Sequence, residues 1–347
     1  MGTRPRQKVR VGLIGCGANM AGHAGRLLTN PDVEIVGLVD PVPEAITLLR
    51  ERRPPLASVP AFASHGEMLR EVRPDAVEIS TPHTLHFEHI MDSLETGCHV
   101  LVEKPMVSRV ADAREVIRLS EELGKVVLVS YQRHYQPAFR FIRQTIASGK
   151  IGELQFVQAL QNQNWYRRQK AAQRWRIKPE LSGGGQLNDS GSHLLDILLY
   201  ASGLRVESVY CQQHFLGLQV DVNSSLTVAF VGGALGSLSI VGNAPGIGGA
   251  VWEDITFYGS EGAIYYRMMG NLERAPIIEL RLQSKEVPEA IAELPPGSDP
   301  DANFVDAILG RAPVESPAVC GLRVAELTES AWRSAKTGRP VRVEELG

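Results

Sequence analysis

Short apolar segments rich in Val and Ile alternate with amphipathic segments along the first third of the chain. The apolar segments predict strands, and the segments between them carry apolar residues at helical spacing. We expect strands at residues 9–14, 33–39, 76–80, 99–102 and 126–131, and helices at 21–28, 43–53, 64–72, 85–95 and 111–123. Ser64 followed by Glu67 matches the capping-box pattern at the start of one helix. This alternation is typical of βαβ units on a parallel sheet, so the first part is predicted to be doubly wound α/β.

The pattern changes after residue 131. We expect a helix at 137–148, a strand at 154–164, a glycine-rich turn at 183–185 and helices at 189–200 and 321–336. Between residues 206 and 282, strand-like segments alternate with turns, which is typical of a largely antiparallel sheet. We therefore predict two domains, over residues 1–131 and 132–347.

The two faces of this antiparallel sheet are expected to differ. Alternate positions carry apolar side chains on one face and small or polar ones on the other: Leu226, Val228 and Phe230 against Ser225, Thr227 and Ala229. The first face can carry helices, and the second can meet another subunit. Because most oligomers are closed and symmetric, we expect a homodimer or homotetramer.

Composition and charge narrow the class of protein. With 44% hydrophobic and 22% charged residues, the chain is typical of a soluble globular protein and not of a disordered or fibrous one. The net charge of -3 argues against nucleic acid or an anionic membrane as the partner. No apolar run approaches the roughly 18 to 20 residues of a membrane helix. Four scattered cysteines form no disulfide framework, so a cytoplasmic protein is expected. The weak net charge is compatible with a neutral small molecule as the ligand.

A glycine-rich sequence joins the first predicted strand to the first helix. It reads Gly15-Cys16-Gly17-Ala18-Asn19-Met20. In a dinucleotide fingerprint the glycines permit a tight turn and bring the backbone to a pyrophosphate at a helix N-terminus. Met20 replaces the third glycine, and Gly22 and Gly25 are candidates for restoring close helix packing.

Asp40 ends the second predicted strand, where a carboxylate can accept hydrogen bonds from the adenosine ribose hydroxyls. It would repel a 2′-phosphate, and neither Pro41 nor Val42 supplies a positive charge. NAD is therefore predicted in preference to NADP. The alternative is a solvated aspartate in a doubly wound protein that binds another ligand.

Polar residues also follow the third and fourth predicted strands, at the sheet edge where such folds bind ligands. These are Thr81-Pro82-His83 with His86, and Glu103-Lys104-Pro105. The alternative for Glu103 and Lys104 is a surface ion pair. His83, His86 and His89 are evenly spaced, but no cysteine or acidic cluster completes a metal site, so no metal is predicted.

Asp189 and His193 follow the glycine-rich turn and are expected on one face at the start of a helix. The helix dipole there favours an ionised Asp189 and a neutral His193. A neutral imidazole beside a carboxylate suits a general base near neutral pH. The alternative is a capping aspartate and a core histidine.

Together these motifs resemble the Gfo/Idh/MocA family, the glucose-fructose oxidoreductase and inositol dehydrogenase group. The resemblance spans nearly the whole chain and also includes Tyr131-Gln132-Arg133, Trp175-Arg176 and Asn303-Phe304-Val305-Asp306-Ala307. It implies an α/β protein with an N-terminal Rossmann domain and a C-terminal substrate-binding and oligomerisation domain on an open, largely antiparallel sheet. It also implies a nicotinamide-dependent dehydrogenase acting on a sugar, a cyclic polyol or a derivative. The chain departs from the family pattern at Met20 and at His83, where Asn is common.

The resemblance also implies residue roles. Lys104, Asp189 and His193 match the family's catalytic group, and Arg176 matches a position near the substrate. Trp165, Tyr166 and Trp175 suit a sugar ring, or they are core aromatics. The expected cofactor contacts are Gly15, Cys16, Gly17, Ala18, Asn19, Met20, Asp40, Thr81, Pro82, His83, His86, Glu103 and Lys104.

The expected reaction moves a hydride from an alcohol carbon to the nicotinamide, in a cleft where the two domains meet. His193 takes the hydroxyl proton, while Lys104 hydrogen-bonds the same oxygen and stabilises its developing charge. Asp189 orients His193. Lys104 as the base is an open variant. Two other functions stay open: an NAD-dependent glycosidase that oxidises its substrate transiently, and a non-catalytic dinucleotide-binding sensor.

Overall fold

The computed structural model describes residues 8–247, 249–270 and 275–347. The chain divides into two compact units. The first unit comprises Met1–Val107, Asp112–Gln132 and Ser298–Val319, and the second comprises Ser108–Ala111, Arg133–Gly297 and Cys320–Gly347. The division into domains after residue 131 stays a prediction. The grouping of Ser298–Val319 with the N-terminal part of the chain was not indicated by the sequence.

The first unit is built on a parallel sheet with the strand order β3-β2-β1-β4-β5-β6. Its strands are β1 (Val9–Ile14), β2 (Val33–Val39), β3 (Ala61–Phe62), β4 (Ala76–Ile79), β5 (His99–Val102) and β6 (Val127–Val129). This order is that of the Rossmann fold, and it places the ligand-binding crevice outside the carboxyl ends of the strands. The predicted doubly wound sheet is confirmed, with β3 as a short addition.

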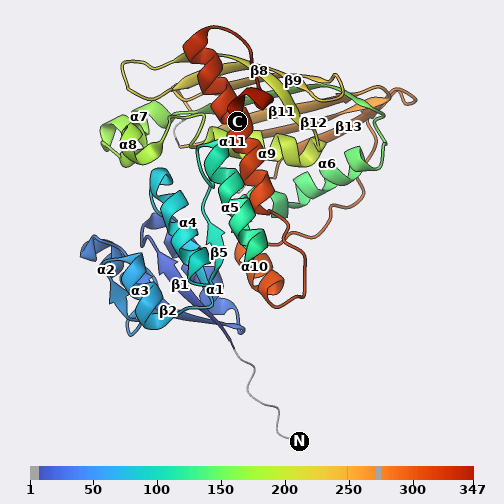
Figure 1. Cartoon of the computed structure of the whole chain (residues 1–347). Helices are drawn as coiled ribbons and strands as arrows, with labels where there is room; N and C mark the ends of the chain where they lie inside the picture. The colour runs from blue at the N-terminus through green and yellow to red at the C-terminus, as the bar shows by residue number, and fades with distance from the viewer. Residues whose placement is uncertain (1–7, 248, 271–274) are drawn as a thin grey trace, which may run out of the picture. The chain divides into compact units, whose positions relative to one another are not determined.

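Helices connect and cover these strands (Figure 1). They are α1 (Ala18–Thr29), α2 (Pro43–Arg52), α3 (His65–Val72), α4 (His86–Glu95), α5 (Val110–Glu122) and α10 (Pro300–Ile308). All helices predicted for this part occur, with ends that differ by at most three residues. Ser64 is the N-cap of α3, as the capping-box pattern indicated, although its side chain makes no capping hydrogen bond. Phe304 and Val305 of α10 pack in the same core as β1 and α1.

The second unit is built on an eight-stranded sheet with the order β13-β12-β11-β7-β10-β9-β8-β14. Its strands are β7 (Leu154–Gln163), β8 (Val206–His214), β9 (Asn223–Phe230), β10 (Leu235–Val241), β11 (Val251–Gly259), β12 (Gly262–Gly270), β13 (Ile277–Leu282) and β14 (Val341–Arg342). All neighbouring pairs are antiparallel except β7 with β10. The predicted largely antiparallel sheet is therefore confirmed.

The faces of this sheet differ as predicted. Leu226, Val228 and Phe230 are buried, whereas Ser225 and Thr227 are exposed. Helices α6 (Pro137–Ala147) and α9 (Gly191–Ser202) lie on one side of the sheet, and α9 packs against β7 (Figure 1). The remaining helices of this unit are α7 (Trp165–Ala171), α8 (Pro179–Ser182) and α11 (Ala318–Thr337), whose first two residues belong to the first unit. Among the described residues, no helix is both long and apolar enough to span a membrane.

Candidate functional site

The turn between β1 and α1 has the geometry that a dinucleotide fingerprint requires. Gly15 has a φ of 89°, and a Cβ there would lie 2.7 Å from the carbonyl oxygen of Ser80. Gly17 is the N-cap of α1 and makes no side-chain cap, and a Cβ there would meet nothing within 4 Å. The start of α1 is therefore open to a phosphate group, which backbone N–H groups and the helix dipole favour.

Met20 stands where the fingerprint has its third glycine. Its side chain is fully buried and packs in the core of the first unit. Of the two later glycines, Gly25 allows a close approach, but the neighbouring group is a side chain and not a strand. Gly25 lies beneath Arg53, whose Nη2 would be 2.7 Å from an added Cβ and whose Nε donates to the carbonyl of Ala21 at 2.8 Å.

Asp40 is fixed beside this turn. Its Oδ2 accepts the N–H of Cys16 at 2.9 Å, and its Oδ1 accepts the N–H of Val42 at 2.9 Å. Each carboxylate oxygen keeps a further lone pair for a ribose hydroxyl. Burial and the charge of Asp40 raise the pKa of Cys16 to about 12, so its thiol stays neutral at physiological pH. The glycine turn, the open helix start and this carboxylate together fit a dinucleotide.

His86 connects the two loops predicted to follow β4 and β5. Its Nδ1 lies 2.8 Å from the carbonyl oxygen of Pro105 and its Nε2 lies 3.0 Å from that of Thr81. Burial lowers its pKa, so the neutral ring donates to one of these carbonyls. His89 instead contacts Thr81 Oγ1 through Nδ1 at 3.1 Å. His86 and His89 are thus both engaged by residues of these loops.

Glu103 and Lys104 stand at the end of β5 and are both buried, so they do not form the surface ion pair considered as the alternative. Glu103 Oε2 accepts the N–H of Lys104 at 3.1 Å, and Oε1 lies 3.1 Å from His23 Nε2. Burial opposes ionisation of Glu103, but the hydrogen bond and charge of His23 outweigh it and lower the pKa of this carboxyl.

In the second unit, the structure brings several of the predicted substrate residues together around Asp189. The Asp189 Oδ2 atom accepts Trp165 Nε1–H at 2.7 Å and pairs with Arg176 Nε at 3.0 Å. The guanidinium of Arg176 also lies 4.4 Å from the centre of the Trp175 ring. Asp189 is buried, so these donors hold its negative charge in place.

The aromatic residues differ in exposure. Trp165 is 1% exposed and packs with Val220 and Val222, as a core aromatic does. Tyr166 is half-buried, and its hydroxyl donates to the carbonyl of Leu216 at 3.2 Å. Trp175 is also half-buried. Trp175 therefore suits a face-on contact with a sugar ring better than Trp165.

His193 lies in the first turn of α9 and is half-buried. The helix begins at Gly191, so Asp189 lies in the turn before it and does not share a helix face with His193 as predicted. The reason is local: Asp189 N–H closes a turn onto Gly185 at 2.9 Å, and its carboxylate is engaged by Trp165 and Arg176.

Sequence reasoning missed Asp221, which supports the loop that carries Asp189. Its Oδ1 accepts the N–H of Gly185 at 3.0 Å and its Oδ2 accepts the N–H of Leu187 at 2.8 Å. A Cβ on Gly185 would lie 1.9 Å from the carbonyl oxygen of Asp221. No local pattern marks Asp221, because its partners are distant in the sequence.

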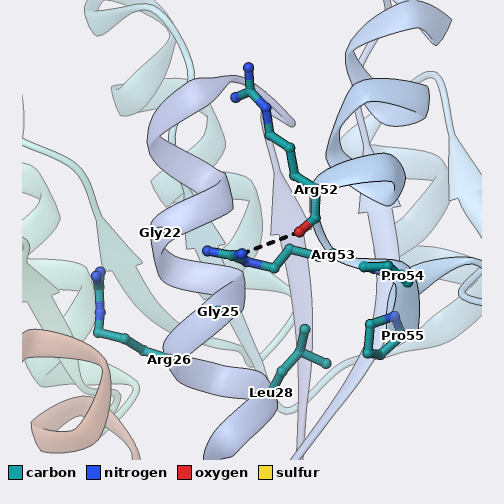
Figure 2. A pocket seen from close by; sticks show the side chains of 8 residues that line it. All are labelled: Gly22, Gly25, Arg26, Leu28, Arg52, Arg53, Pro54 and Pro55. Atoms are coloured by element: carbon teal, nitrogen blue, oxygen red, sulfur yellow. Dashed lines mark hydrogen bonds between the residues drawn. The ribbon is translucent and has the colours of Figure 1, made fainter.

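A surface pocket of about 560 Å³ in the first unit includes Gly25 and Arg53 but none of the predicted site residues. Its lining comprises Gly22, Gly25, Arg26, Leu28, Arg52, Arg53, Pro54 and Pro55. Figure 2 shows that its three guanidinium groups point in different directions, with Arg53 lying across α1. The pocket therefore does not converge on an anion.

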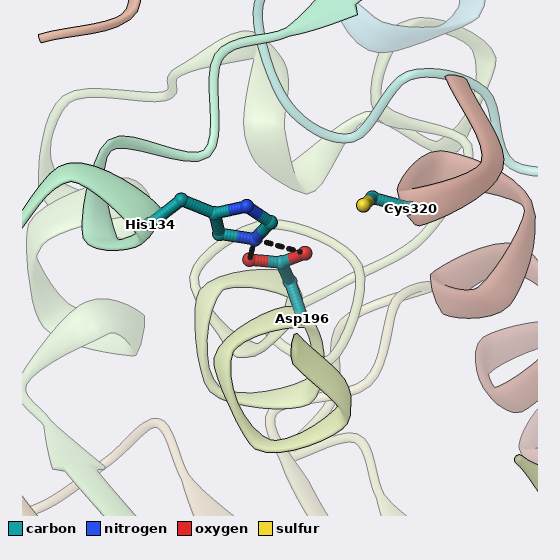
Figure 3. A group of neighbouring side chains, drawn as sticks. All are labelled: His134, Asp196 and Cys320. Atoms are coloured by element: carbon teal, nitrogen blue, oxygen red, sulfur yellow. Dashed lines mark hydrogen bonds and ion pairs between the residues drawn. The ribbon is translucent and has the colours of Figure 1, made fainter. Parts of the chain in front are cut away.

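Three clusters among the described residues have the composition of metal ligands, and none includes Lys104, Asp189 or His193. His134, Asp196 and Cys320 form one in the second unit (Figure 3). His134 Nε2 lies 2.9 and 3.0 Å from the carboxylate oxygens of Asp196, and its ring stacks on Tyr200 at 3.7 Å. Burial raises the pKa of Cys320 to about 12, which keeps its thiol neutral. The other two clusters are His23 with Glu78 and Asp301, and His65 with Glu88 and Asp92.

Two family models match consecutive parts of the chain. Residues 9–131 match the oxidoreductase family with an NAD-binding Rossmann fold, and residues 139–265 match the GFO/IDH/MocA C-terminal domain. D-glucoside 3-dehydrogenase of Escherichia coli is 31% identical over 56% of this chain and 54% of its own length. The NADP(+)-dependent scyllo-inositol 2-dehydrogenase IolW of Bacillus subtilis is 30% identical over 58% of this chain and 54% of its own. The chain thus spans about half the length of these two curated relatives.

A solved structure extends the likeness over the full fold. The WlbA dehydrogenase of Bordetella pertussis, in complex with NADH and UDP-GlcNAcA, has a TM-score of 0.83 and 25% identity, covering 97% of this chain and 99% of its own. Both halves of the chain match models of one family, and both sheets have the expected topology. The chain therefore belongs to the Gfo/Idh/MocA family of NAD-binding oxidoreductases.

Proposed function

We propose that the protein is an NAD-dependent dehydrogenase that oxidises an alcohol carbon of a sugar, a cyclic polyol or a derivative. The observation that carries the proposal lies in the first unit. The open glycine turn, fixed by Asp40, shares a sheet edge with Lys104 at the end of β5. A dinucleotide-binding loop and a buried amine at the same sheet edge favour an enzyme that reacts with the cofactor over a protein that only binds it.

Sugars and cyclic polyols are supported as substrates by two independent features. Trp175 and Arg176 offer an aromatic face beside hydrogen-bond donors, which suits a ring with apolar faces and a hydroxyl rim. Two relatives are named as dehydrogenases of a glucoside and of an inositol. The carbon that is oxidised and the physiological direction are left to experiment.

The proposed roles follow from chemical type. NAD, when bound, supplies the hydride acceptor. His193 takes the proton from the substrate hydroxyl, and Lys104 donates a hydrogen bond to the same oxygen as negative charge develops on it. Asp189, held by Trp165 and Arg176, accepts a hydrogen bond from a neighbouring hydroxyl. Its role in orienting His193 is the one that the family resemblance implies. The alternative mechanism, in which Lys104 accepts the proton, must be distinguished from this one by experiment.

A substrate panel tests the proposal. Free pyranoses, inositols and aryl glycosides are each incubated with NAD, and NADH absorbance and released aglycone are followed together. We expect NADH to accumulate with at least one free sugar or polyol. Aglycone release without NADH accumulation would identify a glycosidase instead, and binding of NAD without turnover of any compound would favour a sensor.

A further inference from the structure

His23 is an almost fully enclosed titratable group of the first unit, and the proposed chemistry does not use it. It lies on α1 and is 2% exposed. Carboxylates from three other elements surround it: Glu78 of β4, Glu103 at the end of β5, and Asp301 of α10. Arg26, one turn further along α1, is the second cation of the group.

The two ring nitrogens of His23 face different carboxylates. Nε2 lies 3.1 Å from Glu103 Oε1, and Nδ1 lies 2.8 Å from Asp301 Oδ1. Arg26 Nη2 is also 3.2 Å from Nδ1, but the shorter contact to the carboxylate places a proton on Nδ1. A ring that donates from both nitrogens is an imidazolium.

The charges of the group balance when His23 is protonated and Glu78 is neutral. Burial alone would lower the pKa of His23, but hydrogen bonds to Asp301 and Glu103 and the charge of Glu78 raise it well above its usual value. Burial and the charge of Asp301 raise the pKa of Glu78 well above its usual value, which favours the neutral form of this carboxyl. Two cations, His23 and Arg26, then face two anions, Glu103 and Asp301.

Glu103 transmits this arrangement to Lys104. One carboxylate oxygen receives His23, and the other accepts the backbone N–H of Lys104 at 3.1 Å. Gln132 adds only a long contact to Glu103, at 3.4 Å. The side chain that holds the Lys104 backbone is therefore itself held mainly by His23.

We propose that His23 is a positioning residue for Lys104, acting as a buried imidazolium that holds the Glu103 carboxylate against the Lys104 backbone. The expected effect of His23 on turnover rests on the proposed function, whereas the hydrogen bonds from His23 through Glu103 to the Lys104 backbone do not depend on it. His23, Glu78 and Asp301 also have the composition of a divalent cation site, which the experiment below must separate from a protonated ring.

Two substitutions of His23 each keep one of its two hydrogen-bond donors. The amide nitrogen of His23→Gln falls near the place of Nε2 and keeps a donor for Glu103. The amide nitrogen of His23→Asn falls near the place of Nδ1 and keeps a donor for Asp301 only. Both remove the positive charge and each keeps one donor, so they serve as controls for each other. Glu78→Gln is a further control, because it changes the cluster without removing either hydrogen bond of His23.

We expect His23→Asn to lower kcat by about 10²-fold, the usual cost of a small misplacement near the reacting atoms, with KM for the sugar little changed. His23→Gln should keep most of the activity, and Glu78→Gln should keep wild-type kcat. The readout without substrate is amide hydrogen exchange of Lys104 in the full chain, followed by NMR. The Lys104 amide should exchange faster in His23→Asn than in His23→Gln or the wild type.

Equal Lys104 exchange in the Asn and Gln variants would overturn the proposal even in an inactive protein. Equal kcat values for the two variants of an active enzyme would do the same. A wild type that turns over no compound, yet shows the expected exchange, would count against the proposed function and leave the positioning role intact. One bound divalent cation per chain in the wild type, lost in His23→Asn, would replace the imidazolium with a metal site.

Discussion

Asp40 is the residue on which we base the predicted choice of cofactor. Its carboxylate is fixed by the backbone N–H groups of Cys16 and Val42. Its negative charge is expected to repel a 2′-phosphate. We expect NAD to bind more tightly than NADP by calorimetry, and Asp40→Ser to narrow the difference. Tighter binding of NADP by the unmodified protein would overturn this prediction. The comparison is informative because the relative from Bacillus subtilis is named for NADP.

His193 and Lys104 are predicted to act on one substrate oxygen. His193→Ala should lower kcat by about 10² to 10⁴ fold, the usual contribution of a positioned acid or base. Lys104→Ala should lower it by about 10² to 10³ fold, as the loss of one preorganised donor does. Steady-state kinetics of the double mutant should show far less than the product of the two effects. A His193→Ala enzyme with near-normal turnover and an unchanged basic limb of its pH profile would move the proton transfer to Lys104.

Glu78 leads to a prediction about stability and pH. Its pKa in the folded protein lies well above 4.5, so the folded state holds a proton that the unfolded chain releases. The free energy of unfolding therefore falls as the pH rises from 4.5 through the folded-state pKa. Glutamine mimics the protonated carboxyl, so Glu78→Gln should flatten this fall in urea denaturation at a series of pH values.

His23 contributes a further pH dependence, which Glu78→Gln should retain. Because its pKa is raised, its contribution is complete below 6.5 and is lost as the pH rises through the folded-state pKa. If the free energy of unfolding changes with pH in the same way for Glu78→Gln and the wild type from pH 4.5 upward, Glu78 is ionised in the folded protein.

At the scale of single residues, local motifs predicted those that lie at the ends of strands. Gly15, Asp40 and Lys104 were predictable because parallel strands bring their carboxyl ends to one edge. His23 and Asp221 were not, because each acts through partners far away in the sequence. Trp165 was open between two roles, since burial cannot be read from residue type alone.

At the scale of elements, period and length predicted most strands and helices. The parallel pairing of β7 with β10 escaped, because strand order depends on contacts between distant segments. The start of α9 was placed two residues early, because Asp189 looked like a helix cap but binds Trp165 and Arg176. Side-chain partners from other segments decided these details.

The loop before α9 supplies a prediction at the same scale. A methyl group at Gly185 would collide with the backbone of Asp221, so Gly185→Ala should cost about 1 to 3 kcal/mol in the free energy of unfolding. Its kcat should also fall, because Asp189 follows this turn, while NAD affinity stays unchanged. Gly249→Ala is the matched control, since an added Cβ meets nothing within 4 Å. Equal stability of the two variants would show that the loop yields freely.

At the scale of the whole molecule, the exposed face of the second unit's sheet predicts self-association. Trp252 and Met269 are direct partners across β11 and β12 and are 38% and 59% exposed. Light scattering should show a dimer or tetramer, and Met269→Arg should lower its mass. Val287→Arg, at a side chain 69% exposed outside the strands, is the control. A monomeric wild type across micromolar concentrations would contradict the prediction.

The central claim is that a hydride leaves an alcohol carbon of the substrate and remains on the cofactor. The most direct measurement uses the sugar or polyol found in the panel, labelled with deuterium at the carbon that is oxidised, and determines the label in NADH by mass spectrometry. The account predicts one deuterium in NADH for each oxidised product released. Product release with no net NADH, or NADH without deuterium, would contradict it.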